Sequence, residues 1–198
     1  MSPRLRIVIL ALTFLLGLMV SLGTVLLLTP GQNSSVKVQQ SSVGGAFSLV
    51  DHNGSRVTDQ SFSGGPFLVF FGFTHCPEIC PTALFEMSEI LRALGGDTGA
   101  INALFITIDP ERDTAEKLKD YLQSFDPRLK GLTGSVAEIE QVAKAYRAYY
   151  KKVPLPDGDY TMDHSTIVYL MNKDGQFVAP FNIKRPPEQA AADLRPYL

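Results

Sequence analysis

The chain of 198 residues carries 18 basic and 20 acidic side chains, so its formal net charge at pH 7 is −2. The basic residues are dispersed and form no cluster, which argues against nucleic-acid binding. Only two cysteines are present, too few for an iron–sulfur cluster held by one chain.

The first predicted element is an N-terminal membrane anchor over residues 1–29. Residues 7–28 contain no charged side chain and are mainly Leu, Val and Ile, long enough to cross a hydrocarbon core of about 30 Å. The run continues without a small-residue cleavage site, which favours an uncleaved anchor over a signal peptide. Arg4 and Arg6 precede it and the next basic residue is Lys37, so we expect a single-pass protein of the bacterial inner membrane with its C-terminal domain in the periplasm.

A predicted tether and a predicted domain follow the anchor. Residues 30–45 are rich in Gln, Ser, Asn and Gly, a composition typical of a flexible linker. Residues 46–198, about 150 residues, are enough for one domain with a sizeable core. An exported domain lies where disulfides can form. A bridge between cysteines four residues apart would stabilise little, so this spacing suits chemistry better than structure.

The remaining elements alternate between strands and helices, which predicts an α/β fold with a central sheet covered by helices on both faces. The loop over 154–163 contains Pro, Gly and Asp, and a last helix begins at Pro186. The predicted strands are 47–51, 66–73, 101–108, a short one within 129–135, 165–171 and 176–181, and the predicted helices are 81–94, 115–125 and 136–149.

Cys76 and Cys80 lie between a predicted strand and its helix, as in a thioredoxin-like fold. Helical spacing would bring their Cα atoms to about 6 Å, within disulfide range. The helix N-terminus should favour a thiolate at Cys80, and a turn containing Pro77 and Pro81 is expected to be exposed. Two soft thiolates suit Cu(I) or Zn(II), and Cu(I) needs fewer further ligands. A redox pair and a metal site both remain open on this spacing.

The histidines are the candidate nitrogen ligands. His52 lies in a predicted turn far from the cysteines, and His75 is expected to be exposed or bonded to backbone because neighbouring side chains in an extended loop point apart. Position alone does not separate a structural role from a ligand role for His164. Asp159 or Asp163 could orient its imidazole, although solvent-facing carboxylates are favoured. Asp109 and Glu111 are expected only to cap the following helix.

Three segments resemble the Sco/SenC family in order and spacing: "GFTHCPEICPTAL", "ITIDPERDTAEKLKDYLQSFDPRLKGLTGS" and "DGDYTMDHSTIVYL". The resemblance runs from about Ala46 to the end of the chain. These proteins are membrane-anchored, thioredoxin-like and copper-binding. The resemblance implies that Cys76, Cys80 and His164 bind one copper per chain, as Cu(I) and as Cu(II).

The resemblance also implies a function. It points to a metallochaperone, not an enzyme, that delivers copper to the binuclear copper centre of cytochrome c oxidase subunit II, with another copper chaperone as a possible donor. The alternative is a thiol–disulfide oxidoreductase that keeps the cysteines of that centre reduced and uses Cys76 and Cys80 as its redox pair. His164 separates the two hypotheses, because thiol exchange requires no imidazole ligand.

Overall fold

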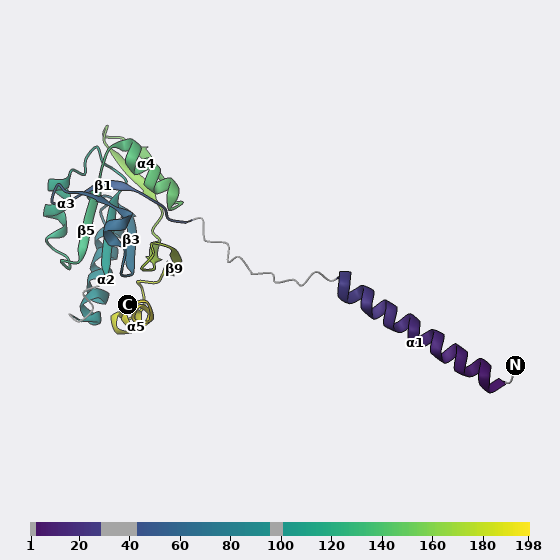
Figure 1. The fold of residues 1–198 in the computed structure, drawn as a ribbon. Coiled ribbons are helices and arrows are strands. Elements are labelled where there is room, and N and C mark those ends of the chain that lie inside the picture. Colours follow the sequence, from purple (N-terminus) through teal and green to yellow (C-terminus); the bar gives the residue numbers. More distant parts are fainter. Residues whose placement is uncertain (1–2, 29–42, 96–100) are drawn as a thin grey trace. The chain divides into compact units, whose positions relative to one another are not determined.

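The computed structural model describes residues 3–28, 43–95 and 101–198. The chain divides into two compact units, Met1–Gln39 and Gln40–Leu198. In the first, the predicted helix is present as α1 (Pro3–Leu28; Figure 1, purple). No helix among the described residues is long and apolar enough to cross a membrane, so the structure does not confirm the predicted anchor. The predicted tether lies almost wholly outside the described residues.

A seven-stranded mixed sheet forms the centre of the second unit, in the order β2-β1-β5-β4-β3-β8-β9 (Figure 1). The three central strands β3, β4 and β5 are parallel, while β1 and β8 pair with them antiparallel. The strands are β1 (Ser48–Asp51), β2 (Arg56–Thr58), β3 (Phe67–Gly72), β4 (Asn102–Thr107), β5 (Leu129–Thr133), β8 (Val168–Met171) and β9 (Phe177–Phe181).

The apolar sequence of β3 explains its central place. All six of its residues are buried, as expected for a strand covered on both faces. Successive side chains point to opposite faces. Phe71 contacts Tyr146, which follows α4, and Phe70 on the other face stacks on Phe105 of β4 at 6.2 Å between ring centroids. The core therefore lies on both sides of the sheet.

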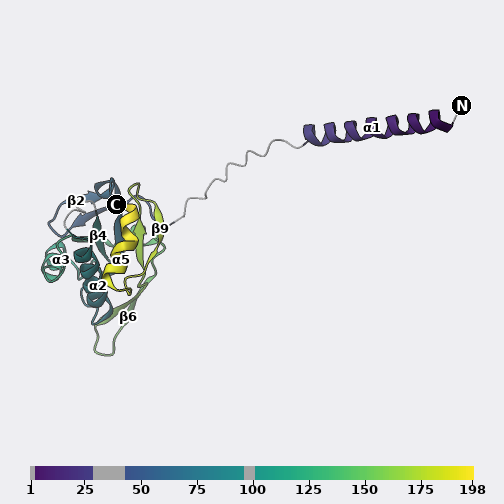
Figure 2. The same cartoon turned by 90° about the horizontal axis from the view of Figure 1, so that it is seen from below.

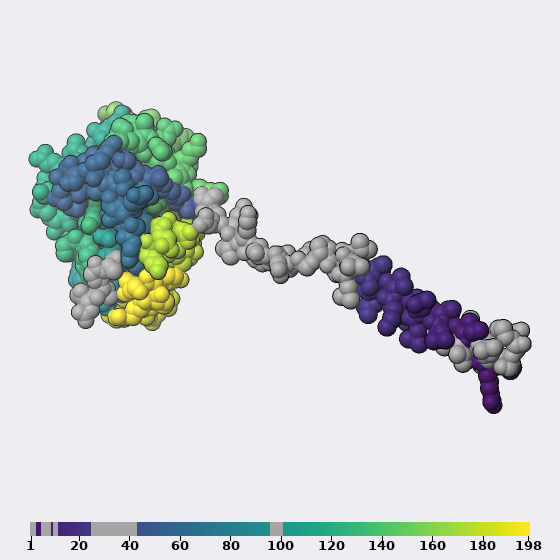
Figure 3. Space-filling model, viewed as in Figure 1, coloured from purple at the N-terminus to yellow at the C-terminus, as the bar shows by residue number. Residues whose placement is uncertain are grey.

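Helices cover both of these faces, so the predicted α/β architecture is confirmed. Phe105 contacts Tyr121 of α3, whereas α4 lies over the face of Phe71. Figure 2 shows α2 and α5 side by side, and Figure 3 shows the C-terminal residues, in yellow, at the surface of the domain. The helices are α2 (Ile79–Leu94), α3 (Ala115–Leu122), α4 (Val136–Ala145) and α5 (Pro187–Leu194), with short 3-10 helices η1 (Asp59–Phe62) and η2 (Arg195–Tyr197).

Three predicted helix boundaries are wrong. Helix α3 ends at Leu122 and not at 125. Helix α2 begins at Ile79, so Pro81 lies within the first turn. Proline is tolerated there because the first amides of a helix have no partner within it. Helix α4 ends at Ala145 and not at 149, since Arg147 has a positive φ of 54°, which is incompatible with a right-handed helix.

The predicted loop over 154–163 is also wrong in part. The structure has a hairpin here, formed by β6 (Tyr150–Pro154) and β7 (Tyr160–His164), which pair antiparallel. Within the described residues, these two strands form a sheet of their own and are not part of the large sheet. The hairpin carries His164 at its end, and its attachment to the domain therefore determines where that histidine lies.

Candidate metal centre

Cys76, Cys80 and His164 come together in the structure. Their potential ligand atoms all lie within 4.8 Å of one another, and Cys80 Sγ is 3.6 Å from His164 Nε2. Each residue comes from a different place: the loop after β3, the first turn of α2 and the end of β7. The three residues singled out from the sequence thus form one cluster.

The cysteines themselves are buried, although the sequence predicted that they lie in an exposed turn. Cys80 is fully buried and Cys76 is 9% exposed, and both are free thiols. The backbone N–H of Cys80 donates to Cys76 Sγ at 3.3 Å. Gly72 at the end of β3 leaves room for the thiol, because a Cβ there would lie only 2.8 Å from Cys80 Sγ. The two cysteine side chains therefore point toward the sheet, whereas Pro77, Glu78 and Ile79 of the turn between them are exposed.

Burial also corrects the prediction that Cys80 favours a thiolate. Desolvation raises the pKa of the Cys80 thiol far above its ordinary value. Two smaller influences oppose each other: a hydrogen bond from the Phe73 backbone lowers this pKa, and the nearby Cys76 raises it. The favourable helix N-terminus does not compensate for this loss of hydration. Without a metal, the Cys80 thiol therefore keeps its proton at neutral pH.

His164 is held in an orientation that suits a ligand. Its Nδ1 lies 2.9 Å from the carbonyl oxygen of Ser165, which only accepts hydrogen bonds, so Nδ1 carries the proton. Nε2 is then left with a free electron pair and points toward Cys80. The edges of Phe73 and Phe70 pack on the ring, with centroids 5.7 and 6.2 Å away.

The acidic residues predicted as possible partners of His164 lie elsewhere. Asp163 is exposed on β7, and exposed Asp159 pairs with Arg112 at 3.3 Å. The carbonyl oxygen of Ser165, and not a carboxylate, binds Nδ1 of His164 and orients the imidazole. The favoured prediction of solvent-facing carboxylates is therefore confirmed for both.

The residues predicted to cap the helix after β4 do not cap it. Thr114 is the N-cap of α3 and accepts from the Lys117 amide. Asp109 is instead buried and accepts from Arg112 Nε at 2.5 Å and from the Tyr160 hydroxyl at 2.8 Å. Glu111 forms an ion pair with Lys152 at 2.6 Å. Each carboxylate therefore binds a side chain of the hairpin, and Asp109 also binds Arg112 three residues away.

Asp113 is a supporting residue that the sequence reasoning missed. It is fully buried and accepts from the Thr74 amide at 2.9 Å, from Thr74 Oγ1 at 2.5 Å and from Thr107 Oγ1 at 2.7 Å. These bonds fix the backbone two residues before Cys76. Its only sequence signal is an acidic residue just before a helix, which is indistinguishable from a capping residue.

The other two histidines lie outside the cluster. His52 Nδ1 accepts from the Gly131 amide at 2.9 Å, a structural bond between β5 and the turn after β1. His75 is exposed, as predicted, and its ring nitrogens lie 3.2 Å from Thr74 Oγ1 and 3.5 Å from Lys117 Nζ.

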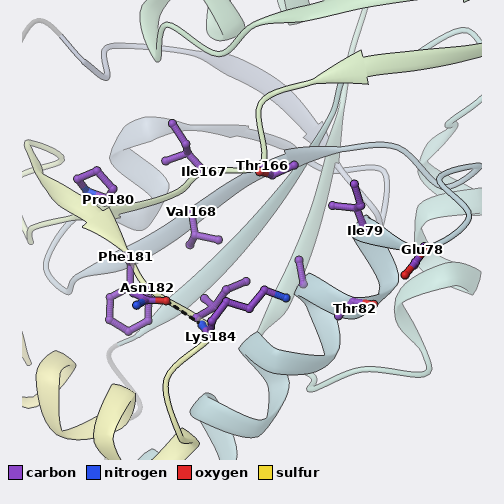
Figure 4. A pocket seen from close by; sticks show the side chains of 12 residues that line it. Glu78, Ile79, Thr82, Thr166, Ile167, Val168, Pro180, Phe181, Asn182 and Lys184 are labelled. Carbon is purple, nitrogen blue, oxygen red and sulfur yellow. Dashed lines mark hydrogen bonds between the residues drawn. The ribbon is translucent and has the colours of Figure 1, made fainter.

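The cluster borders a hollow in the surface, and a second hollow lies beside the first. A cavity of about 250 Å³ is lined by Cys76, His164 and their neighbours. An apolar groove of about 490 Å³ shares the lining residues Glu78, Ile79 and Thr166 with this cavity (Figure 4). In Figure 4, Ile79 and Ile167 stand on either side of Thr166, and both isoleucines are exposed.

The donor set suits a soft, low-coordinate metal ion. Two sulfurs and one imidazole nitrogen match copper or zinc, but structural zinc requires a fourth ligand. Three donors arranged trigonally at about 2.2 Å from an ion lie about 3.8 Å apart. The observed 3.6 Å between Cys80 Sγ and His164 Nε2 is already close to that spacing. Small shifts would therefore complete a three-coordinate site.

Comparison with known proteins identifies the family. The family model described as SCO1/SenC matches residues 35–198. The human "Protein SCO1 homolog, mitochondrial" is 43% identical over 162 residues, which make up 78% of this chain and 54% of that protein. The chain thus spans about half the length of this curated relative.

Solved structures agree with this assignment. Bradyrhizobium japonicum ScoI with copper bound is 61% identical with a TM-score of 0.77, covering 79% of this chain and 99% of that one. Arabidopsis thaliana ScoI with copper bound is 39% identical with a TM-score of 0.71, covering 76% and 94%. Sequence, fold and the cysteine–histidine cluster all agree, and the chain belongs to the SCO1/SenC family.

Proposed function

We propose that this chain binds one copper ion through Cys76, Cys80 and His164 and delivers it to the binuclear copper centre of cytochrome c oxidase subunit II. The observation that carries the proposal is the convergence of three donor atoms within 4.8 Å from three separate elements. Relatives of similar fold, 61% and 39% identical, have been solved with copper bound, which supports the choice of metal.

The charge of the site suits both oxidation states of copper. Two thiolates and a neutral imidazole leave Cu(I) with one net negative charge and Cu(II) with none. A bound cation reverses the effect of burial, because it stabilises the thiolate that desolvation disfavours at Cys80. Copper binding therefore releases the Cys80 proton. Cys76 and His164 line the cavity and offer a partner's ligands a route to the ion.

We further propose that α1 anchors the domain to the bacterial inner membrane, with the domain in the periplasm. Apolar side chains of α1 such as Leu12, Phe14 and Met19 are exposed in the structure. Exposed apolar side chains of this kind are stabilised by contact with lipid. Arg4 lies at the start of the helix, consistent with a cytoplasmic N-terminus.

A second candidate function is thiol–disulfide exchange with the cysteines of the same oxidase centre. It is favoured by one observation: both thiols are free and adjacent, with the Cys80 amide donating to Cys76 Sγ. Attack on a disulfide requires an accessible thiolate and a neighbouring resolving thiol.

The test mixes the copper-loaded full chain, in detergent, with the apo, reduced copper domain of subunit II and follows the absorption and EPR signals of the binuclear centre. Formation of that centre is expected for the wild type and not for Cys76→Ser. A parallel reaction combines the metal-free chain with the oxidised domain. Transfer of electrons without any transfer of copper would overturn the metallochaperone proposal in favour of the thiol reductase.

A further inference from the structure

The position of His164 depends on how the β6–β7 hairpin is attached to the domain. The hairpin pairs only with itself in the described structure, from Tyr150↔His164 to Pro154↔Tyr160. The ladder hydrogen bonds of the large sheet therefore do not fix it. At its base, the Ser165 amide donates to the Tyr149 carbonyl oxygen at 2.9 Å and the chain continues into β8. Farther out, its place relative to the cysteines depends on side chains that connect it to neighbouring segments.

Arg112 connects to the hairpin through several contacts with one residue, Tyr160. Its guanidinium carbon lies 3.7 Å from the centre of the Tyr160 ring, and its Nη1 donates to the Tyr160 carbonyl oxygen at 3.0 Å. The Nε of Arg112 donates to buried Asp109, which also accepts from the Tyr160 hydroxyl. Arg112 and Asp109 thus hold the ring, the hydroxyl and the backbone of one residue of β7.

Tyr160 and His164 are the first and last residues of strand β7, so a movement of one end of the strand shifts the other. Residues 160, 162 and 164 of a β-strand point to the same face, and Met162 between them is buried. The two ends of this series are about 13 Å apart at 3.3 Å per residue. A hairpin released at Tyr160 can rotate or slide, and the imidazole at the other end moves with it.

The segment that holds the hairpin also holds the cysteine turn. Asp113, the residue after Arg112, accepts two hydrogen bonds from Thr74, which lies two residues before Cys76. Residues 109–113 therefore hold both halves of the metal site, the cysteine half through Asp113 and the histidine half through Arg112. The cysteine turn and the hairpin are therefore bound to the same short segment of the chain.

We propose that Arg112 is a positioning residue for copper: through Tyr160 it keeps the β6–β7 hairpin at the distance from the cysteine turn at which His164 can complete the site. This inference rests on the proposed copper site. Arg112 itself touches no ligand atom in the cluster. Its effect falls more on Cu(II) than on Cu(I), because two thiolates alone can hold Cu(I) but Cu(II) requires the nitrogen donor.

The experiment compares Arg112→Ala and Arg112→Lys with Arg128→Ala in the full chain. Arg128 is a matched control, because it also pairs with a buried carboxylate, Asp126, while its hydrogen bonds within the described residues reach neither the hairpin nor the cysteine turn. Lysine keeps the charge of Arg112 and loses its planar, forked contacts. Tyr160→Leu is a second variant, which removes the ring and leaves the Arg112–Asp109 pair intact.

Copper affinities are measured by competition with chelators, together with the visible and EPR spectra of the Cu(II) form and the thermal unfolding of the apo-protein. We expect Arg112→Ala and Tyr160→Leu to lower Cu(II) affinity by about tenfold or more and to change the Cu(II) spectra. Arg112→Lys should recover little of this. Arg128→Ala should lower thermal stability and leave copper affinity and spectra unchanged.

A double-mutant cycle tests the route through the histidine. In a His164→Ala background, Arg112→Ala should cause no further loss of Cu(II) affinity, since the residue it positions is gone. Equal copper affinities and spectra for wild type and Arg112→Ala, or full additivity in the cycle, would overturn the inference while leaving the copper site intact. Absence of copper binding by the wild type would overturn both proposals.

Discussion

Substitution of Gly72 by alanine tests whether the metal site depends on the space above the end of β3. The Cβ of alanine at this position would lie 2.6 Å from Phe105 Cε2 and 2.8 Å from Cys80 Sγ. Both neighbours are fully buried, and because protein interiors are close-packed, neither can move without displacing other side chains. The effect is steric and not conformational, since Gly72 is part of a regular strand.

The size of the effect follows from these contacts. Overpacking of a core by one methyl group costs ~2 kcal/mol, which lowers the Tm of a domain of this size by about 4–8 °C. Cys80 Sγ must also retreat by about 0.6 Å to go from 2.8 Å to the 3.4 Å at which ordinary van der Waals contact begins. Metal sites tolerate deviations of about 0.2 Å in ligand distance. We therefore expect copper affinity to fall by about tenfold or more.

Gly131→Ala is the matched control. Its Cβ would meet Leu122 Cδ1 at 2.8 Å and Leu118 Cβ at 3.1 Å, so it overpacks the core against α3 and touches no residue of the cluster. Thermal unfolding and chelator competition are measured for both variants. Similar losses of Tm with a loss of copper affinity only in Gly72→Ala would support the reasoning. Equal copper affinities in Gly72→Ala and Gly131→Ala would refute it.

The remaining predictions concern the three proposed ligands. Cys76→Ser or Cys80→Ser should abolish tight Cu(I) binding in an anaerobic competition assay, because each removes one of two soft anionic donors; tight binding in both variants would disprove the assignment. His164→Ala should weaken Cu(II) binding more than Cu(I) binding in the same assay, and unchanged affinities would return His164 to a structural role. Because burial raises the pKa of the Cys80 thiol, this group is protonated at neutral pH and copper must displace its proton. Copper affinity measured at pH 6, 7 and 8 should therefore rise about tenfold per pH unit from this group alone, and a flat profile would contradict it.

The central strands, the cysteine pair and the histidine were each predicted from a different kind of signal in the sequence. The central strands β3 and β4 are mainly apolar runs, and such runs can be recognised in a sequence without knowledge of tertiary contacts. The cysteine pair is visible from its spacing at a strand–helix junction. His164 is different, because its place in the sequence allowed a structural role equally well. Its role as a candidate ligand came from the family resemblance and its proximity to Cys80 from the structure.

The errors arise where tertiary contacts outweigh local patterns. Residues 154–163 of the hairpin region were predicted as a loop because they contain Pro, Gly and Asp. The stability of the hairpin comes in part from Arg112, which is far away in the sequence and contacts Tyr160. The burial of Cys80 was missed for a similar reason, since only the structure shows that Gly72 makes room for the thiol.

The geometry of Cys80 also determines how His164→Ala separates copper delivery from thiol exchange. Cys80 is fully buried, so an incoming disulfide must react first at Cys76, the more accessible sulfur. That step requires no imidazole. The second step is different, because His164 Nε2 lies 3.6 Å from Cys80 Sγ and can accept the proton of the resolving thiol.

His164→Ala should therefore leave formation of the mixed disulfide at Cys76 unchanged and slow its resolution by Cys80. Mass spectrometry of the quenched reaction measures the two steps separately, and a slower first step would show that His164 acts on Cys76 as well. Copper affinity, by contrast, depends on His164 at equilibrium, so an intact first step together with weakened Cu(II) binding would identify His164 as a metal ligand.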